Sequence, residues 1–529
     1  MKKWAAIRIL EGQPIAPNPL LKRSIRMDMN SSASNLPVFF PNEDFDTHFK
    51  VFHELMSNKV FEILLVASPY DAYILEEDGS LASKIINEYR GLNLSRPPRI
   101  TQAATAAQAM EMLAQKQFHL VIAMPHLDDM DVFDPGQQIK RAHADLPVVL
   151  LAHSVKGIYP APEGKDISGI DQTFIWSGDS DLLLAIVKSM EDQLNVAADT
   201  QKAMVRVLIL VEDSPLYTSY FLPLIYKEVV NQTQEVLEES LNQEHRLLKM
   251  RARPKILVAR NYEEADGLFE RYEPYVLGVI SDVRFPRNGK LDENAGVTFL
   301  SKIKKERFDI PLLLTSSESS NAAKAVKIPA LFVDKNSPSL ISEVRSFFLE
   351  QLCFGEFIFR MPDGSEIARA SNTRAFERLL HEIPDDSFVH HASRNDLSRW
   401  LFARTEIMLA SKVRPIREDD FSTVDKHRQY LLSIIQARRS RRQKGVVVNF
   451  EANEFDLDTE FFKIGTGSLG GKARGLAFVS NLLKRLPAIH QKFENINIFV
   501  PQAMVITTEG FEAFVEENNL KGYSKSDAP

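Results

Sequence analysis

The sequence predicts an α/β protein in which a doubly wound, five-stranded parallel sheet occurs twice in tandem. Short apolar runs alternate with stretches of helical periodicity, which is typical of βα units. The same order of runs and helices occurs over 60–195 and again over 205–352, which indicates an internal duplication. In the second copy the apolar runs end in polar residues, and this predicts a functional site at the carboxyl edge of that sheet.

Length and composition limit the class of protein. The chain has 529 residues, enough for about three to five domains of ordinary size. A net charge of −7 argues against binding to nucleic acid or to a membrane surface, and no apolar run has membrane-spanning length. The single cysteine, Cys353, excludes an intramolecular disulfide and indicates a reducing compartment. Because Arg8 interrupts the N-terminal apolar stretch, we expect no signal peptide and a cytoplasmic protein.

Changes in composition divide the chain into five segments. Residues 1–45 are rich in Pro, Asn and Ser and predict a flexible tail. The remaining segments are two sheet domains, a mostly helical connector and a C-terminal domain, over 46–198, 199–352, 353–450 and 451–529.

The first sheet domain is expected to follow an amphipathic helical segment over 45–55. Further helices are predicted near 81–89 and over 104–116 and 181–195. Its strands are predicted over 60–66, 100–102, 118–124, 146–151 and 171–176.

The second sheet domain repeats this order. Helices are predicted over 217–250, 262–271 and 340–352. The strands are predicted over 205–211, 255–259, 279–282, 312–316 and 331–335.

Five polar residues lie at the strand ends of the second copy. They are Glu212, Asp213, Asp282, Thr315 and Lys335. Because the carboxyl ends of parallel strands meet at one edge of a sheet, these side chains should lie together. Carboxylate oxygens suit Mg²⁺, and a hydroxyl and an ammonium suit phosphoryl oxygens. A purely structural ion-pair network is the alternative, but the five positions in the right strand order favour a phosphate and metal site.

The first copy has neutral residues at the corresponding positions. Alignment of strand ends places Ala67, Ser68, Met124, Ala152 and Trp176 there. Without the metal carboxylates there is no set of hard oxygens for Mg²⁺, and the first copy is expected to be inert.

On these residues, 205–352 resembles a response-regulator receiver domain, and 60–195 resembles a degenerate pseudo-receiver. The resemblance implies a flavodoxin-like fold in which Asp282 is the phosphoacceptor. It implies that the phosphoryl donor is a phosphohistidine on a kinase or phosphotransfer protein. It also implies that Glu212, Asp213 and Asp282 bind Mg²⁺, and that Thr315 and Lys335 bind phosphoryl oxygens. Transition-state charge would be neutralised by Mg²⁺ and Lys335.

The second copy also departs from the receiver pattern. Phe332 falls where receivers carry a switch aromatic, but Asn336 stands where proline commonly follows the lysine. An insert over 286–295, with Asn288 and Gly289, lengthens the loop after Asp282.

The connector is predicted to begin with a strand over 356–361 and an Asp-Gly turn, followed by helices over 370–380, 394–409 and 421–439. His390 and His391 precede Asp396, and hydrogen bonding at a helix start is favoured over metal binding, because adjacent side chains diverge. The basic run over 438–444 is interpreted as a solvated or acid-paired helix end.

A Gly-rich turn over 465–471 precedes a predicted helix that continues to about 484. Backbone N–H groups of Gly470 and Gly471, with Lys472, could bind phosphate, but this turn by itself favours a flexible linker before a glycine-capped helix. Together with the segment over 499–511, this stretch resembles the start of the nucleotide-binding domain of phosphoenolpyruvate synthases and pyruvate phosphate dikinases. The resemblance covers 455–529 and implies an ATP-grasp-like fold with Lys472 near ATP phosphates.

Three functions are compatible with these patterns. The first is a phosphorelay signalling protein in which Asp282 regulates an attached phosphoenolpyruvate-synthase-like module that is too short for catalysis alone. The second is a fragment of a pyruvate, water dikinase-like phosphotransferase. The third is a scaffold whose receivers mediate homodimerisation. The sequence identifies neither the output reaction nor the donor kinase, nor the direction of regulation.

Overall fold

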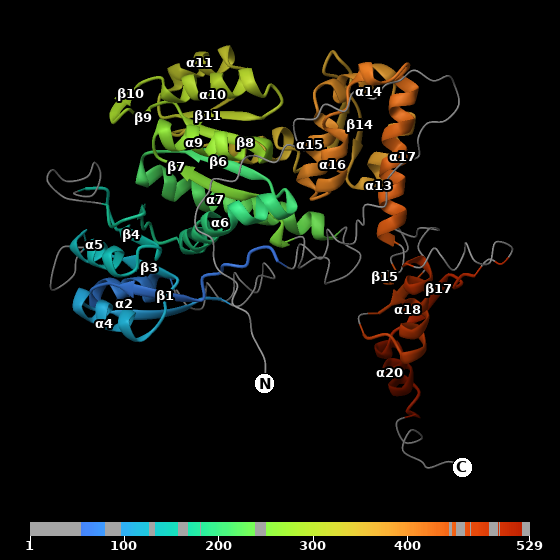
Figure 1. The fold of residues 1–529 in the computed structure, drawn as a ribbon, viewed down its shortest axis with the longest axis horizontal. Coiled ribbons are helices and arrows are strands. Elements are labelled where there is room, and N and C mark those ends of the chain that lie inside the picture. Colours follow the sequence, from blue (N-terminus) through green and yellow to red (C-terminus); the bar gives the residue numbers. More distant parts are fainter. Residues whose placement is uncertain are drawn as a thin grey trace, which may run out of the picture. The chain divides into compact units, whose positions relative to one another are not determined.

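The computed structural model describes residues 54–79, 97–125, 133–156, 168–179, 181–238, 250–443, 447–450, 461–465, 467–485, 496 and 498–520 (Figure 1). The predicted tail over 1–45 and the predicted helix near 81–89 lie outside the described residues, as does most of the segment over 45–55. Among the described residues, no helix combines the length and apolarity needed to cross a bilayer.

The first domain contains a five-stranded parallel sheet in the order β2-β1-β3-β4-β5. All five predicted strands are therefore confirmed. They are β1 (Glu62–Val66), β2 (Arg99–Ala103), β3 (Leu120–Ala123), β4 (Val148–Ala152) and β5 (Gln172–Ile175). The helices described with them are α2 (Pro69–Gly79), α4 (Ala106–Gln115), α5 (Phe133–Ala142) and α6 (Asp181–Ala203).

Helix α2 was not predicted, because its apolar residues show no clear helical periodicity. It begins directly after β1, where the Ser68 hydroxyl accepts a hydrogen bond from the Asp71 N–H at 3.1 Å. A serine in this position satisfies one of the backbone donors at a helix start.

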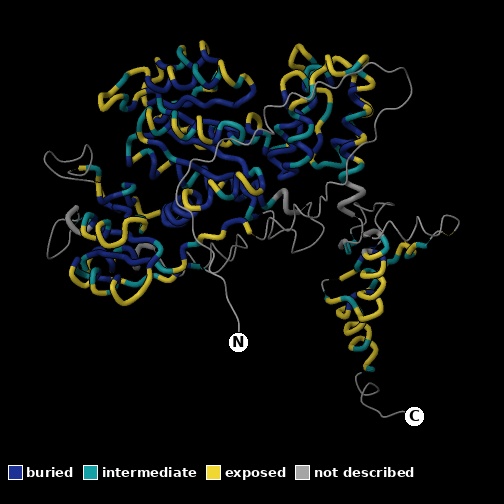
Figure 2. The backbone as a smooth tube through the Cα atoms, in the orientation of Figure 1, coloured by how far each residue is buried: buried dark blue, intermediate teal, exposed yellow. Residues whose placement is uncertain are grey.

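The second domain repeats the topology, with the strand order β7-β6-β8-β11-β12. Its strands are β6 (Val207–Val211), β7 (Lys255–Ala259), β8 (Val276–Asp282), β11 (Leu312–Ser316) and β12 (Leu331–Asp334). Its described helices are α7 (Pro215–Glu238), α9 (Tyr262–Tyr272), α10 (Ala295–Glu306), α11 (Ala322–Lys327) and α12 (Leu340–Ser346), with a π-helical turn over Phe347–Gln351. Both sheets have the order 2-1-3-4-5 of flavodoxin-like folds, and their inner strands are buried, whereas the edge strands β2 and β12 are partly exposed (Figure 2). The predicted duplication is confirmed at the level of fold.

The predicted insert after Asp282 forms a small antiparallel hairpin of β9 (Phe285–Arg287) and β10 (Lys290–Asp292). Asn288 and Gly289 form its two-residue turn with φ values of 51° and 72°. Positive φ at both central residues is what Asn-Gly supplies in a tight hairpin.

The two domains share one apolar core. Helix α6 of the first domain packs against α7 and β7 of the second, and side chains of both domains belong to a single buried cluster. Ionic contacts are buried in the same interface: Asp192 of α6 binds Arg253, and Asp199 binds Lys255 at 2.9 Å. These charges lie at the amino end of β7, on the opposite edge of the sheet from the predicted site.

The connector begins with a hairpin of β13 (Phe357–Arg360) and β14 (Glu366–Ala370), as the Asp-Gly turn predicted. Five helices follow: α13 (Thr373–Glu382), α14 (Asp385–Ser393), α15 (Asp396–Ala403), α16 (Ile407–Val413) and α17 (Val424–Gln443). The prediction of one helix over 394–409 is wrong, because Thr405 has a φ of 58° and separates α15 from α16. Phe376 stacks on Trp400 in the connector core, with ring centroids 4.6 Å apart.

The connector contacts the amino edge of the second sheet through Asp309, which lies just before β11. Its carboxylate accepts hydrogen bonds from Arg414 at 2.6 Å and from the Asn395 amide at 3.0 Å. Burial alone would raise the pKa of Asp309, but Arg414, Arg307 and Asn395 bring it below its usual value. Because the folded-state pKa is lowered, this carboxylate stabilises the fold above about pH 4, and its contribution disappears as the pH falls further.

Replacing Asp309 by asparagine is therefore expected to destabilise the protein by about 2 kcal/mol at pH 7, since a charged acceptor of buried donors is lost. The difference from wild type should shrink below pH 4, which urea unfolding at several pH values would measure. Asp334→Asn is the control: its pKa is also lowered, through Ser319 and the Asn336 N–H, but its side chain is only partly buried. A difference for Asp309→Asn that persists unchanged at acid pH would contradict this assignment.

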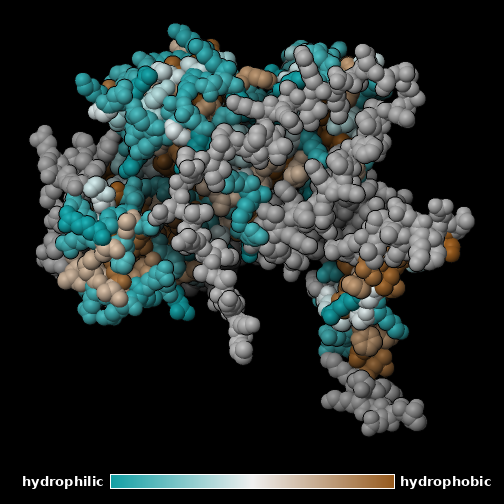
Figure 3. All heavy atoms as spheres, in the orientation of Figure 1, coloured by the Kyte–Doolittle hydropathy of each residue, from teal (hydrophilic) through white to brown (hydrophobic). Residues whose placement is uncertain are grey.

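The C-terminal part contains a three-stranded parallel sheet in the order β15-β16-β17. Its elements are β15 (Val447–Asn449), β16 (Phe461–Ile464), α18 (Gly471–Arg485), β17 (Ala503–Ile506) and α20 (Thr508–Glu517). The helix predicted after the Gly-rich turn is confirmed. Apolar side chains such as Phe478, Ile506 and Phe511 are exposed on this part (Figure 3).

Candidate functional site

The five predicted site residues lie together at the carboxyl edge of the second sheet. Glu212 and Asp213 follow β6, and Asp282 ends β8. Thr315 lies opposite Asp282 in the parallel pairing of β11 with β8, and Lys335 follows β12. The adjacency of β6, β8, β11 and β12 is what brings residues more than a hundred positions apart into one site.

Three carboxylates form the acidic half of the site. One oxygen each of Glu212, Asp213 and Asp282 lies within 4.8 Å of the others. Three hard oxygens at this separation fit a divalent cation such as Mg²⁺, which binds through few carboxylates and keeps several waters.

Lys335 supplies the positive charge. Its Nζ lies 2.6 Å from Oε2 of Glu212 and 3.2 Å from Oδ2 of Asp282, and its side chain is 2% exposed. Thr315 is buried, and its hydroxyl donates a hydrogen bond to the Ser281 carbonyl at 3.4 Å.

The site holds more negative charge than its one ammonium compensates. Burial, together with the nearby carboxylates of Asp282 and Asp213, raises the pKa of Glu212 to about 8, although Lys335 acts to lower it. Burial also raises the pKa of Asp282, although Lys335 and the Val283 N–H oppose this effect. Burial acts to lower the pKa of Lys335, but Glu212 and Asp282 outweigh it, so the lysine stays charged. A bound divalent cation would relieve this imbalance.

Backbone contacts fix the position of Asp282. Its Oδ1 accepts a hydrogen bond from the Val283 N–H at 2.8 Å, and the Val283 carbonyl accepts one from Gly296 of α10 at 3.0 Å. A Cβ atom on Gly296 would lie 1.9 Å from the Asp282 carbonyl oxygen. The close approach of α10 to Asp282 therefore requires glycine, a constraint that the sequence pattern did not reveal.

The structure corrects the predicted alignment of the two copies at two positions, one through strand register and one through the start of a helix. Leu151, rather than Ala152, corresponds to Thr315 in the pairing with the central strand. Helix α2 begins one residue closer to its strand than α7 does, so Ser68 corresponds in helix position to Ser214.

Ala67, Met124 and Trp176 correspond to Glu212, Asp282 and Lys335, as predicted. These three residues of the first copy are buried and apolar. At these positions the first domain therefore has apolar packing where the second has charges.

Phe332, at the position of the receiver switch aromatic, lies in β12, and Asn336, which departs from the receiver pattern, lies just after that strand. Phe332 is half-buried against the core of the second domain. Asn336, in place of proline, donates hydrogen bonds from its N–H to Asp334 and from its amide to the Ser317 carbonyl, both at 2.8 Å. It thereby links the loop after β12 to the loop after β11.

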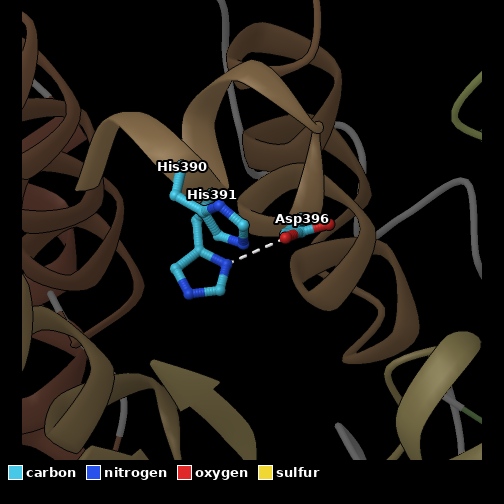
Figure 4. A group of neighbouring side chains, drawn as sticks. All are labelled: His390, His391 and Asp396. Carbon is cyan, nitrogen blue, oxygen red and sulfur yellow. Dashed lines mark hydrogen bonds and ion pairs between the residues drawn. The ribbon is translucent and has the colours of Figure 1, made fainter. Parts of the chain in front are cut away.

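His390, His391 and Asp396 in the connector form a second cluster (Figure 4). Contrary to the spacing argument, one possible ligand atom from each lies within 4.8 Å of the others. His391 Nε2 accepts a hydrogen bond from the Arg360 N–H at 2.8 Å, so the proton resides on Nδ1, which donates to Asp396 at 2.8 Å. Both ring nitrogens of His391 are thus engaged in protein contacts, which favours a structural role.

The helix-start interpretation holds for Asp396, which lies in the first turn of α15 and binds His391, but not for Asn395. The histidines lie at the end of α14, and Asn395 has a φ of 61° with no side-chain capping bond to α15. Its amide instead bridges Asp309 and Arg417.

The glycine turn lies where the sequence predicted it, at the start of α18. Gly470 and Gly471 have open space around them, and Lys472 is exposed. An acidic side chain also approaches the turn, since a Cβ atom on Gly465 would lie 3.5 Å from Oε2 of Glu509. Arg438, in the basic run at the end of α17, pairs with Glu406 at 3.2 Å, as expected for an acid-paired helix end.

No family model and no curated protein matches the sequence. Among solved structures, the chain is similar to the receiver domain of an HD domain-containing protein from Pseudomonas fluorescens, with 20% identity, 27% of this chain and 94% of that chain covered, and a TM-score of 0.20. It is similar to the receiver domain of a sensor histidine kinase from Pseudomonas aeruginosa with magnesium in its active-site cleft, with 16% identity, 25% and 98% covered, and a TM-score of 0.19.

A longer similarity is to a probable two-component response regulator/GGDEF domain protein, with 14% identity, 55% of this chain and 98% of that chain covered, and a TM-score of 0.25. Such scores carry no argument about function. The chain itself has two five-stranded parallel sheets of flavodoxin-like topology, one of which has an acidic site with a buried lysine.

Proposed function

We propose that the second domain is a phosphoacceptor receiver in a phosphorelay, and that Asp282 takes the phosphoryl group from a phosphohistidine on a donor kinase or phosphotransfer protein. The observation that carries this proposal is the convergence of three carboxylates, a buried lysine and a threonine at one sheet edge. An ion-pair network alone would not require three carboxylates around one ammonium.

In the proposed transfer, a carboxylate oxygen of Asp282 attacks the phosphorus of the phosphohistidine. A P–O bond forms, the P–N bond breaks, and the imidazole leaves with the electron pair and gains a proton. Lys335 and Thr315 contact the phosphoryl oxygens and stabilise the charge on them. Glu212, Asp213 and Asp282 would hold Mg²⁺, which supplies further charge neutralisation when bound.

The test is incubation of the full chain with a small phosphodonor and Mg²⁺, followed by intact-mass measurement. We expect one added phosphoryl group, lost in Asp282→Asn and strongly reduced by a metal chelator. The matched control is Asp71→Asn, since Asp71 lies at the equivalent edge of the first sheet and binds His153 at 3.2 Å. Labelling that survives Asp282→Asn would refute the proposal, whereas Asp71→Asn should be labelled like wild type.

The regulated output belongs to the same proposal. Phosphorylation of Asp282 would bias the connector and, through it, a phosphoenolpyruvate-synthase-like ATP-binding module in the C-terminal part. The contact of Asp309 with Arg414 and Asn395 supports communication between receiver and connector, because Asp309 lies just before β11 and Thr315 lies near the carboxyl end of the same strand.

A phosphotransferase identity is the second candidate, and the glycine turn at the start of α18 favours it. The N–H groups of Gly470 and Gly471, with Lys472, would contact ATP phosphates. Lys472→Ala should then weaken ATP binding by about tenfold in calorimetry, in line with the loss of one charged contact. Arg378→Ala, which lies in the connector, serves as the charge-matched control. Unchanged ATP affinity in Lys472→Ala, or no binding by wild type, would count against this identity.

The scaffold hypothesis is separable from both candidates. If the receivers act only in homodimerisation, gel filtration should show a dimer whose stability is the same in wild type and Asp282→Asn, with or without phosphodonor.

A further inference from the structure

Tyr217 lies over the ammonium of Lys335. It belongs to the first turn of α7, which starts at Pro215, directly after the acidic pair. Its ring centroid is 4.2 Å from Lys335 Nζ. The neighbouring Leu216 and Tyr220 are 48% and 46% exposed, whereas Tyr217 packs against the shared core.

The groups around Lys335 Nζ indicate that the contact with Tyr217 helps to orient the ammonium. The ammonium binds Glu212 and Asp282, and the ring of Tyr217 lies within cation–π distance of the same nitrogen. An aromatic face attracts a cation because of its quadrupole, and the attraction is stronger where the cation is desolvated. With only 2% of the lysine side chain exposed, little water competes for this position.

We propose that Tyr217 is a positioning residue of the phosphoryl-transfer site, whose ring holds the Lys335 ammonium beside Asp282. The inference rests on the proposed function of Asp282 and extends it to a residue outside the five strand-end positions. A flexible lysine has several rotamers, and a charge that stabilises a transition state is effective only when it is already in place. Without the ring, Lys335 would keep its pairing with Glu212 but spend less time directed at the phosphoryl oxygens.

The test compares Tyr217→Leu with Tyr217→Phe in the rate of phosphoryl uptake from a small phosphodonor with Mg²⁺. Leucine keeps an apolar side chain but removes the ring, and uptake should slow by roughly three- to thirty-fold, the range of a desolvated cation–π contact. Phenylalanine keeps the ring face and should restore most of the rate. Tyr220→Leu, one turn further along α7 and exposed, is the matched control and should react like wild type.

Several outcomes would overturn the proposal. Uptake by Tyr217→Leu at the wild-type rate would show that the ring only fills space, and equal impairment of both variants would assign the effect to the hydroxyl. Thermal unfolding of each variant separates a loss of fold from a loss of rate.

If wild type itself takes up no phosphoryl group, the proposed function fails, and the ring–ammonium contact is then judged independently of it. In a double-mutant cycle of Tyr217→Leu and Lys335→Met, the unfolding free energies should be non-additive; additivity would refute the contact as well.

Discussion

Replacing Asp192 by alanine is expected to destabilise the tandem domains by about 3–5 kcal/mol, the cost of breaking a buried ion pair from one side. Asp192 is fully buried, and its two oxygens accept hydrogen bonds from Arg253 at 2.8 and 2.9 Å. The Arg253 side chain is 2% exposed, so its charge would remain in the interface without its acceptor. Two further donors would lose their acceptor, Oδ2 of Asp192: the Tyr226 hydroxyl at 2.7 Å and the Ile256 N–H at 3.0 Å.

Urea unfolding of the full chain measures this effect, and Lys202→Ala is the matched control on the same helix. Lys202 binds Glu54 at 2.9 Å, but both side chains are about half exposed, and such pairs contribute about 0–1 kcal/mol. The double replacement Asp192→Leu with Arg253→Met should recover part of the loss, because it removes both charges. Equal destabilisation by Asp192→Ala and Lys202→Ala would contradict a buried network.

This network could not be predicted from the sequence. In helix α6, Asp192, Asn195 and Asp199 are polar residues at helical spacing, a pattern that normally marks the solvent face. They are buried because their partners are distant in the sequence. Asp192 and Asp199 bind Arg253 and Lys255 of the second domain, and the Asn195 amide donates a hydrogen bond to the Asn58 carbonyl, more than a hundred residues earlier. Periodicity within one segment carries no information about such partners.

The strands were predictable for the opposite reason. A strand buried on both faces of a parallel sheet is apolar throughout. Runs such as 207–211 and 148–152 can therefore be recognised as strands from their own residues, without knowledge of the strands beside them. Helices are harder where caps and short breaks determine them. The start of α2 depends on the Ser68 cap, and the break between α15 and α16 depends on one positive φ at Thr405.

The functional site likewise contains residues that could be predicted from the sequence and residues that could not. Its charged residues were found because strand ends in parallel order converge on one edge, a property of topology. Tyr217 and Gly296 were missed, because their relation to the site arises from how α7 and α10 pack on it. Neither an aromatic residue in a first helical turn nor a single glycine at a helix start indicates by itself which strand it contacts.

Replacement of Gly296 is the second change for which we expect a large effect, because it should both disable the phosphorylation site and destabilise the fold. Any Cβ at this position meets the Asp282 carbonyl oxygen at 1.9 Å, and the Ser281 hydroxyl oxygen at 3.0 Å. The nearest atom is backbone, so it cannot turn away as a flexible side chain could. Either α10 moves outward or the end of β8 moves, and in both cases the Gly296–Val283 hydrogen bond and the orientation of Asp282 are disturbed.

Gly296→Ala is therefore expected to cost about 3 kcal/mol or more in urea unfolding, at the upper end of overpacking effects, and to abolish most Asp282 phosphorylation. Gly267→Ala is the matched control. Gly267 lies inside α9 with no atom near its would-be Cβ, so alanine should stabilise the protein by about 1 kcal/mol through helix propensity. The same chemical change thus has opposite expected signs in two helices of one domain. If Gly296→Ala were as stable and as reactive as wild type, α10 could not approach Asp282 as closely as described, and the site would have to be formed differently.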